Sequence, residues 1–330
     1  MPIFSRGLAA AFAALAVMTM TAAAQEMPIP PANPPAKRII TQGLATPTID
    51  NLFKCEGPAS NYRISAMGKI TAQDGTLLTV PAENQYRTGP KLADLYNECS
   101  RVTPATFAEV KIEDAPIVEI DKDGEVVTGF VIGDNYFELY VNGKLVGVDS
   151  IPYTPFNSAI VRFRVKRPYT YAFLLVDWEE KLGLGMEKMP NNDWHAGDGG
   201  IIAKFSDGTV TDSSWKAQSF YIAPLAQPED VIERGTTHDT TKLGRVHPVA
   251  KVPQCREQCY AVHYPMPEGW SWPAFDDSTW PRAYEYTDTD VGVTSLTGYW
   301  RYPEAFLGGR WIWTVNLVFD NLVLARKTVR

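Results

Sequence analysis

The chain has little of what metal centres, thiol chemistry and nucleic-acid binding require. Only four cysteines and four histidines occur among 330 residues. Neither an H-E-x-x-H nor a G-x-S-x-G motif is present, so the signatures of zinc proteases and serine hydrolases are missing. Basic residues never run longer than a pair, and the formal net charge is -7. This charge balance disfavours nucleic acid as a partner.

Long hydrophobic runs are also missing after the first 24 residues. That opening, MPIFSRGLAAAFAALAVMTMTAAA, places Arg6 before an apolar run and ends in three alanines. The pattern predicts a secretory signal peptide over residues 1–24, cleaved after Ala24. A membrane-spanning helix would need about 20 apolar residues, which is longer than this run. We therefore expect an exported protein, periplasmic or extracellular, with no transmembrane segment after cleavage.

The four cysteines are an even number in a chain expected to be exported, and this combination favours disulfides over metal thiolates. Their positions along the sequence group Cys55 with Cys99 and Cys255 with Cys259. Four cysteines nevertheless permit three connectivities, so the pairing stays open at this point. Three residues separate Cys255 from Cys259, which makes CREQC a weak match to a redox or zinc motif.

The N-terminal part of the chain is expected to contribute little to the main fold. Residues 25–50 are proline-rich and lack hydrophobic periodicity, which predicts an extended leader rather than a packed element. Residues 51–107 are expected to form a small segment. Within it, alternation around Asp74-Gly75 predicts a β-hairpin, and the apolar spacing of KLADLYNECS (91–100) predicts a short helix.

From residue 108 onward, short strands and turns alternate without helical periodicity, beginning with AEVKI. The stretch GDNYFELYVNGKLVGVDS (133–150) is the clearest example. Its apolar and polar side chains alternate, and Asn142-Gly143 suits a type I′ turn between two strands. Such repetition predicts an all-β fold, an antiparallel β-sandwich or jelly roll, over residues 108–330. A stretch near 226–255 loses the pattern and is expected to be a long connector.

Four motifs occur in a recognisable order: DNYFELYVNG, GIIAKFSDGTVTDSSWKA, WPAFDDSTWPRA and RWIWT. Together they resemble the galactose-binding-like β-sandwich domains that serve as accessory modules of secreted glycosidases. The resemblance covers about residues 110–330, and it implies a jelly-roll fold that binds carbohydrate. Trp311-Ile312-Trp313 departs from the group, in which the corresponding strand precedes the Tyr-Val-Asn-Gly strand. The motifs VRFRVKRP, VDWEEKLGLG and GDGG also resemble a family of exported bacterial proteins.

The glycine-rich stretch WHAGDGG combines residue types that suit a ligand-binding loop. Trp194, His195 and Asp198 supply a stacking surface, an imidazole and a carboxylate, and the glycines permit close backbone approach. These groups could bind a sugar, or a divalent metal. A plain hairpin connection is the alternative. Asp134 and Asn135, at one end of the 133–150 hairpin, are expected to border this site.

Acidic residues gather in VDWEEKLGLGMEK. Oxygen-rich turns suit calcium, the one cofactor that the sequence suggests, and Asp177 and Glu179 are its expected ligands. Paired carboxylates are also what glycosidases use. A solvated acidic loop is the alternative for the individual glutamates. The FDDSTW and TDSSW stretches are interpreted as structural corners, because Asp and Ser turns form without any ligand.

Three functions are compatible with these features. The favoured one is an exported, non-catalytic module that binds carbohydrate or another cell-envelope component through Trp194, His195 and Asp198. The first alternative is a metal-assisted hydrolase or lyase acting on a polysaccharide, with His195, Asp198 and carboxylates near Glu179 in its site. The second is a structural envelope protein whose aromatic residues all belong to the core, as large apolar side chains usually do.

Overall fold

The computed structural model describes residues 37–53, 55, 64–152, 157–188, 194–243, 257–294 and 296–330. The expected signal peptide, the first part of the expected leader and Cys255 lie outside the described residues. Strands make up 44% of the structure and helical segments 8%. The predicted all-β class is therefore confirmed.

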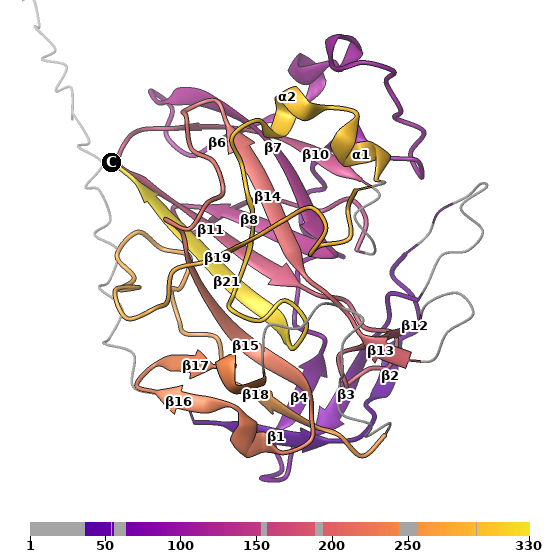
Figure 1. The fold of residues 1–330 in the computed structure, drawn as a ribbon. Helices are drawn as coiled ribbons and strands as arrows, with labels where there is room; N and C mark the ends of the chain where they lie inside the picture. The colour runs from indigo at the N-terminus through magenta and orange to yellow at the C-terminus, as the bar shows by residue number, and fades with distance from the viewer. Residues whose placement is uncertain are drawn as a thin grey trace, which may run out of the picture.

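Two seven-stranded, largely antiparallel sheets form the body of the molecule (Figure 1). The β21 sheet contains, in spatial order, β1 (Ile39–Gln42), β18 (Tyr260–His263), β15 (Lys216–Leu225), β21 (Asp320–Val329), β11 (Tyr169–Val176), β8 (Tyr136–Val141) and β9 (Lys144–Val148). The β7 sheet contains β19 (Tyr284–Tyr286), β20 (Trp311–Trp313), β14 (Gly200–Phe205), β7 (Glu125–Asp134), β10 (Ser158–Val165) and β5 (Ala93–Tyr96), with β6 (Ile117–Glu119) parallel to β10.

Smaller elements surround this body. A three-stranded sheet contains β2 (Thr46–Ile49), β3 (Met67–Thr71) and β4 (Leu77–Val80). Two hairpins pair β12 (Met186–Lys188) with β13 (Trp194–Ala196) and β16 (Ile232–Arg234) with β17 (Thr237–Asp239). The helical segments are α1 (Thr297–Trp300), α2 (Pro303–Phe306) and the 3-10 turns η1 (Phe107–Glu109), η2 (Ile112–Asp114), η3 (Pro228–Asp230) and η4 (Thr241–Leu243).

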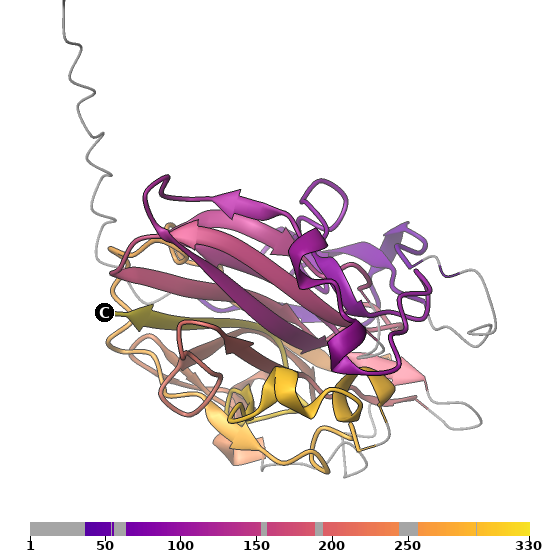
Figure 2. The ribbon, with the colours of Figure 1, turned by 90° about the horizontal axis from the view of Figure 1, so that it is seen from above.

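Aromatic rings fill the space between the two large sheets, which Figure 2 shows as two layers seen from above. Tyr171 of β11 stacks on Phe205 of β14 with ring centres 4.3 Å apart. Phe163 of β10 meets the same tyrosine edge to face at 5.8 Å. Because these strands belong to different sheets, the contacts confirm a β-sandwich with an aromatic core.

The 133–150 stretch forms the predicted hairpin, with β8 and β9 as its strands. Asn142 and Gly143 have φ values of 51° and 79°, as a type I′ turn requires. A Cβ atom on Gly143 would lie 2.2 Å from Cδ1 of Trp272, so a glycine is needed here for packing as well as for the turn. The alternation places Phe137 in the aromatic core, where it meets Phe173 at 5.9 Å.

The outer face of the β21 sheet is covered as well, although alternation within the hairpin suggested a polar face. Glu138, on this face of β8, is 1% exposed. Its carboxylate accepts hydrogen bonds from the Tyr136 hydroxyl at 2.9 Å, the Tyr140 hydroxyl at 2.6 Å and the backbone N–H of Gln85. Burial raises the pKa of Glu138. The loop that carries Gln85 thus lies over β8 and is fixed by the carboxylate beneath it.

Arg326 on β21 also holds a covering loop in place, and its side chain is 1% exposed. Its Nε donates to Asp277 at 2.8 Å, and its terminal nitrogens donate to the carbonyls of Trp270, Trp272 and Phe275. A single guanidinium therefore determines the path of the GWSWPAFDD loop over the sheet.

Turns built from Asp and Ser confirm the structural interpretation of both corners. In FDDSTW, the N–H of Ser278 donates to Asp276 at 2.9 Å. In TDSSW, the N–H of Ser214 donates to Asp212 at 2.8 Å, and Nε1 of the buried Trp215 donates to the carbonyl of Val210 at 2.8 Å. In both stretches the Asp side chain therefore forms a local turn. In TDSSW the indole of Trp215 is also anchored by a hydrogen bond.

Two predictions for the N-terminal part are wrong. Residues 39–49, expected to belong to an extended leader, form β1 and β2, and β1 pairs with β18 at the edge of the β21 sheet. Arg38 fixes this strand by donating to the carbonyl of Val231 at 2.7 Å and to Glu233 at 3.0 Å. The pairing partners lie about 220 residues away in sequence, judging from Ile39 and His263, so local periodicity could not reveal them.

The expected helix over 91–100 is also wrong, because Ala93–Tyr96 form β5 and pair with the start of β10. The apolar spacing there covers a single turn, and an isolated helix of that length is unstable in water. An open strand edge offers backbone partners instead. AEVKI, expected to be a strand, lies in the region of the 3-10 turns η1 and η2. The hairpin around Asp74-Gly75 is confirmed by the pairing of β3 with β4.

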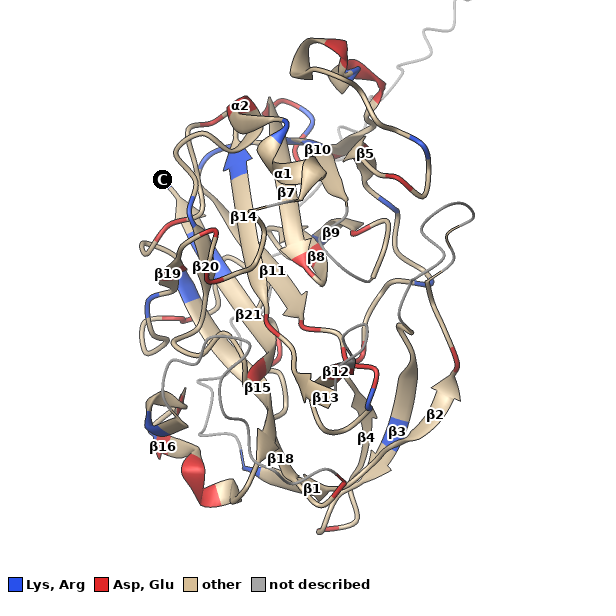
Figure 3. Cartoon of the chain, turned by 45° about the vertical axis from the view of Figure 1, so that its right-hand side comes forward, with Lys and Arg blue, Asp and Glu red and all other residues tan. Residues whose placement is uncertain are grey.

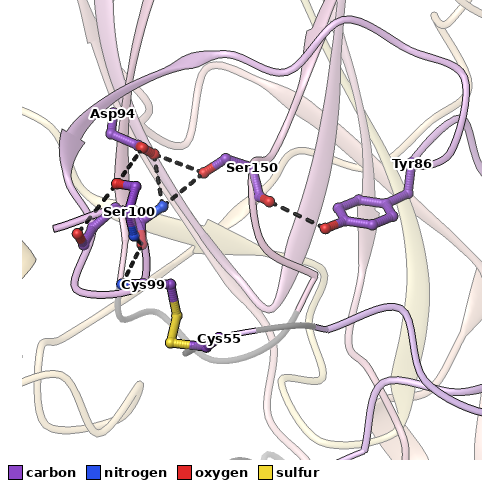
Figure 4. The surroundings of a disulfide bond; sticks show 7 residues. Cys55, Tyr86, Asp94, Cys99, Ser100 and Ser150 are labelled. Atoms are coloured by element: carbon purple, nitrogen blue, oxygen red, sulfur yellow. Dashed lines mark hydrogen bonds between the residues drawn. A yellow bond between two sulfur atoms is a disulfide. The ribbon is translucent and has the colours of Figure 1, made fainter. Parts of the chain in front are cut away.

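The predicted Cys55–Cys99 disulfide is present and links positions 44 residues apart (Figure 4). Phe53 and Ile151 pack together beside both cysteines. Cys259 is disulfide-bonded, and its expected pairing with Cys255 lies outside the described residues. The connector near 226–255 contains the β16–β17 hairpin in its described part.

Replacing Arg326 with methionine should lower the free energy of unfolding by about 3 kcal/mol, because the carboxylate of Asp277, which is 26% exposed, and three carbonyls lose their donor. Chemical denaturation of the Arg326→Met variant measures this loss. Arg164→Met is the matched control. Arg164 pairs with Glu119 at 3.1 Å with 31% of its side chain exposed, so its replacement should cost less than about 1 kcal/mol. Equal losses in the two variants would contradict the role given to Arg326.

Candidate functional site

Residues predicted from three separate stretches lie at one end of the sandwich. Asp134, the last residue of β7, pairs with Gly200, the first of β14. The neighbouring Asn135 donates to the Asp134 carboxylate at 2.6 Å and accepts from the backbone N–H of Trp178 at 2.8 Å. Figure 3 shows acidic positions gathered where β8, β11 and β21 approach the β12–β13 hairpin. We call this region the polar end, and it comprises Asp134, Asn135, Asp177, Glu179, Trp194, His195, Asp198 and Asp320.

The β12–β13 hairpin closes the polar end through a close approach to Asp177. A Cβ atom on Gly197 would lie 2.7 Å from each carboxylate oxygen of Asp177, so a larger residue would require either the Asp177 side chain or the backbone to shift. Asp177 is 1% exposed and follows β11 directly. Its backbone N–H donates to the carbonyl of Asn321 at 2.8 Å. The glycine-rich stretch is therefore shaped by contact with a buried carboxylate.

Glu179 fixes the tight loop that leads into β12. Its carboxylate accepts the backbone N–H groups of Gly183 and Leu184 at 2.9 Å each, and that of Gly185. The hydroxyl of Tyr221 on β15 donates to it at 2.9 Å. Burial raises the pKa of Glu179 to about 7, against the lowering effect of these hydrogen bonds. The carboxylate thus serves as an internal anchor for the LGLG loop.

His195 lies on β13, opposite Glu187 of β12. Its Nδ1 is 2.6 Å from the carbonyl oxygen of Ala196, a contact that requires the proton on Nδ1. Its Nε2 is buried and has no hydrogen-bond partner within the described residues. Asp198 follows in the half-buried connection to β14. One nitrogen of the imidazole is therefore engaged, and the other has no partner in the described part of the chain.

Trp194 differs from the other predicted residues because it is exposed. Its side chain is 39% accessible. The Nζ of Lys181 lies 5.4 Å from the centre of the indole ring and 3.6 Å from the carboxylate of Glu257. The indole thus stands at the polar end with a lysine beside it, held in turn by a glutamate.

The two expected calcium ligands, Asp177 and Glu179, contact different parts of the protein. Asp177 lies against Gly197, whereas the Glu179 oxygens are engaged by the LGLG loop and Tyr221. Within the described ranges, no group of three or more His, Cys, Asp or Glu residues could hold a metal ion. The calcium site stays a prediction without an assembled ligand set.

Sequence reasoning missed a further buried carboxylate at the polar end. Asp320 begins β21 and is 1% exposed. It accepts hydrogen bonds from the hydroxyls of Thr240 at 3.2 Å and Thr314, and burial raises its pKa to about 7. The adjacent Asn321 donates to the carbonyl of Ala223 at 2.8 Å. The available signal was an Asp-Asn pair inside the apolar run LVFDNLVL.

A hollow of about 390 Å³ lies between β5, β10 and the 3-10 turns η1 and η2. Its walls include Leu95, Val102, Val110 and Ile160, together with the carboxylates of Asp94 and Glu109. None of the residues predicted for the site lines it. The region was expected to be a helix followed by a strand, so this hollow was not foreseen.

No protein-family model, curated protein or solved structure matches this chain. The fold class is thus established by the structure alone, as an all-β sandwich. The galactose-binding-like relationship stays a prediction. No helix in the described part of the chain is long and apolar enough to cross a membrane. The Cys55–Cys99 disulfide is typical of proteins in oxidising compartments.

Replacing Glu179 with glutamine should lower the free energy of unfolding by about 2 kcal/mol or more. An NH₂ group would replace an oxygen that accepts backbone N–H groups, which would leave buried donors without an acceptor. Equilibrium unfolding in urea measures the change. Glu229→Gln, at an exposed position, should stay within about 0.5 kcal/mol of the wild type. A Glu179→Gln variant as stable as the wild type would show that the LGLG loop does not depend on this carboxylate.

Proposed function

We propose that this protein is an exported, non-catalytic module that binds carbohydrate at the polar end, with Trp194 as the stacking residue. The exposure of Trp194 carries the proposal. Of nine tryptophans, five are buried: Trp178, Trp215, Trp280, Trp311 and Trp313. Trp194 is 39% exposed and lies beside the ammonium group of Lys181, which pairs with Glu257. Trp300 is more exposed, at 54%, but it lies on α1, outside the polar end, so it is exposure together with position that favours Trp194 as a stacking surface.

The surroundings of Trp194 favour a preorganised binding surface. Lys181 lies beside the ring and is itself paired with Glu257. The backbone of β13 pairs with β12, whose approach is fixed by Glu179. A rigid aromatic surface loses little conformational freedom on binding, so more of the stacking energy is available for affinity.

The polar groups around this surface suit a sugar. Stacking of the C–H face of a pyranose on an indole leaves its hydroxyls free to meet charged and polar side chains at the rim. Lys181, Glu257 and Asp198 supply donors and acceptors at this end. The internal role of Glu179 supports binding over the hydrolase alternative, because its oxygens already serve the loop and Tyr221.

The location of the protein belongs to the same proposal. A disulfide supports export to an oxidising compartment, in agreement with the signal peptide predicted from the sequence. A sugar-binding module in the periplasm or outside the cell would meet polysaccharides of the cell envelope or of the surroundings.

Removing the indole of Trp194 should weaken carbohydrate binding at least about tenfold, which corresponds to roughly 1.4 kcal/mol. Affinity electrophoresis of the folded protein through gels containing soluble polysaccharides identifies a ligand, and titration calorimetry with its oligosaccharide gives the affinity. The matched control is Trp300→Ala. Trp300 is 54% exposed on α1, outside the polar end, and its removal should leave affinity unchanged.

Equal weakening by Trp194→Ala and Trp300→Ala would remove the special role of the polar end. Retention of full affinity in Trp194→Ala, with loss in Trp300→Ala, would move the site to α1. Absence of retardation of the wild type by every polysaccharide would contradict carbohydrate binding itself.

A further inference from the structure

A carboxyl group and an amide form an unusual buried pair beside β9. Asp149 and Asn157 are 1% and 2% exposed. The Nδ2 of Asn157 donates to Oδ1 of Asp149 at 2.5 Å, and the backbone N–H of Ile151 donates to the same oxygen at 3.1 Å. The other two oxygens of the pair, Oδ2 of Asp149 and Oδ1 of Asn157, are buried and have no hydrogen-bond partner within the described residues.

An ionised Asp149 would leave this pair with two buried acceptors and no donor for either. Each buried acceptor without a donor raises the free energy of the folded state, because the atom has lost its hydrogen bonds to water. A single proton on Oδ2 turns one acceptor into a donor. A carboxylic acid and a primary amide can then form two parallel hydrogen bonds, one N–H to the acid carbonyl and one O–H to the amide carbonyl. The first of these bonds is already present.

We propose that Asp149 is protonated in the folded protein at neutral pH and forms a two-bond acid–amide pair with Asn157, a latch that opens when the proton is lost. This pair is independent of the proposed sugar site. With the proton in place, the two oxygens share a hydrogen bond, so neither needs a buried water or a cation as its partner.

The charges around Asp149 agree with this protonation. The pKa of Asp149 is raised to about 8, mainly by burial and also by the nearby Asp94 of β5, against the lowering effect of the two N–H donors and of Lys91. Glu138 and Tyr136 of β8 face the same region, as does Tyr86 of the covering loop. Burial is the main cause of the raised pKa of both tyrosines, and Asp149 adds to it.

The pair lies next in sequence to Ser150 and Ile151, which contact the surroundings of the disulfide. Ser150 donates from its hydroxyl to Asp94 at 2.7 Å, and its carbonyl accepts from the hydroxyl of Tyr86 at 3.2 Å (Figure 4). Ile151 packs against Phe53 beside Cys55 and Cys99. An ionised Asp149 would place a buried charge next to Ser150 and Ile151, with one of its oxygens lacking a donor. The latch thus makes the stability of this region depend on pH.

The direction of this dependence follows from linkage. The folded pKa of about 8 lies above the value of about 3.9 in an unfolded chain. Between these two values the folded state retains a proton that the unfolded state has released. The contribution of Asp149 to stability is therefore complete below about pH 4 and is lost as the pH rises through 8.

The Asp149→Asn substitution tests the latch, because an amide reproduces the shape and the donor of the protonated acid. Thermal unfolding of both proteins from pH 4 to pH 9 should give equal midpoints near pH 4. As the pH rises toward 8, the folding equilibrium should favour the variant over the wild type by up to about tenfold per pH unit. Titration of Glu179 and Asp320 cancels in this comparison. Asp123→Asn, at a side chain 84% exposed, should show no such trend.

Two outcomes would overturn the latch. A variant that is less stable than the wild type by a constant amount from pH 5 to pH 8 would show that Asp149 is ionised. Stabilisation of the wild type by added calcium, sodium or potassium chloride, absent from Asp149→Asn, would show that a cation occupies the pair. Should the variant fail to fold, the carboxyl ¹³C resonance of Asp149 in the wild type decides: a midpoint near 8 is expected, and one below 5 contradicts the latch.

Discussion

Burial of both faces of the central strands β15, β21 and β11 is the constraint on which the rest of the structure depends. Aromatic rings between the sheets cover the inner face, and loops cover the outer one. Each polar side chain under those loops must find its partners inside the protein, because an unpaired buried charge is strongly unfavourable. Arg326 and Glu138 meet this demand by binding the backbone of the loops that cover them. The buried polar side chains of the sheet therefore hold the covering loops in place, and the backbone of those loops supplies the partners that these side chains need.

The same constraint shapes the polar end. Glu179 and Asp320 are buried carboxylates that bind loop N–H groups or threonine hydroxyls, and Asp177 fixes the position of Gly197. With these groups engaged inside the protein, the exposed Trp194 is the side chain to which the proposal assigns ligand contact at this end. The buried polar layer supplies rigidity and the indole supplies contact, which is the division of labour that the carbohydrate-binding proposal requires.

Strand pattern and turn chemistry predicted much of the fold. Asn142-Gly143 and Asp74-Gly75 gave both hairpins, because their conformations are local. Cysteine spacing gave Cys55–Cys99. Residues 39–42 and 93–96 were misassigned because their partners, β18 and β10, lie far away in sequence, and tertiary pairing overrode weak local preference. Residues 46–49 pair with β3 across a shorter span. For the candidate site, the residues of WHAGDGG and VDWEEKLGLG lie together at the polar end, and their role there stays a prediction. The internal partners of Glu179 and the burial of Asp320 depended on packing, which no spacing encodes.

The central claim is that the polar end binds a saccharide through an exposed indole on a fold that is complete without one. Thermal unfolding of the mature protein with a panel of oligosaccharides and divalent cations, each with and without chelator, tests it most directly. A ligand of the native state raises the midpoint by mass action. The account predicts that at least one oligosaccharide raises the midpoint in the presence of chelator. A midpoint raised by a divalent cation alone, or by nothing in the panel, would contradict it.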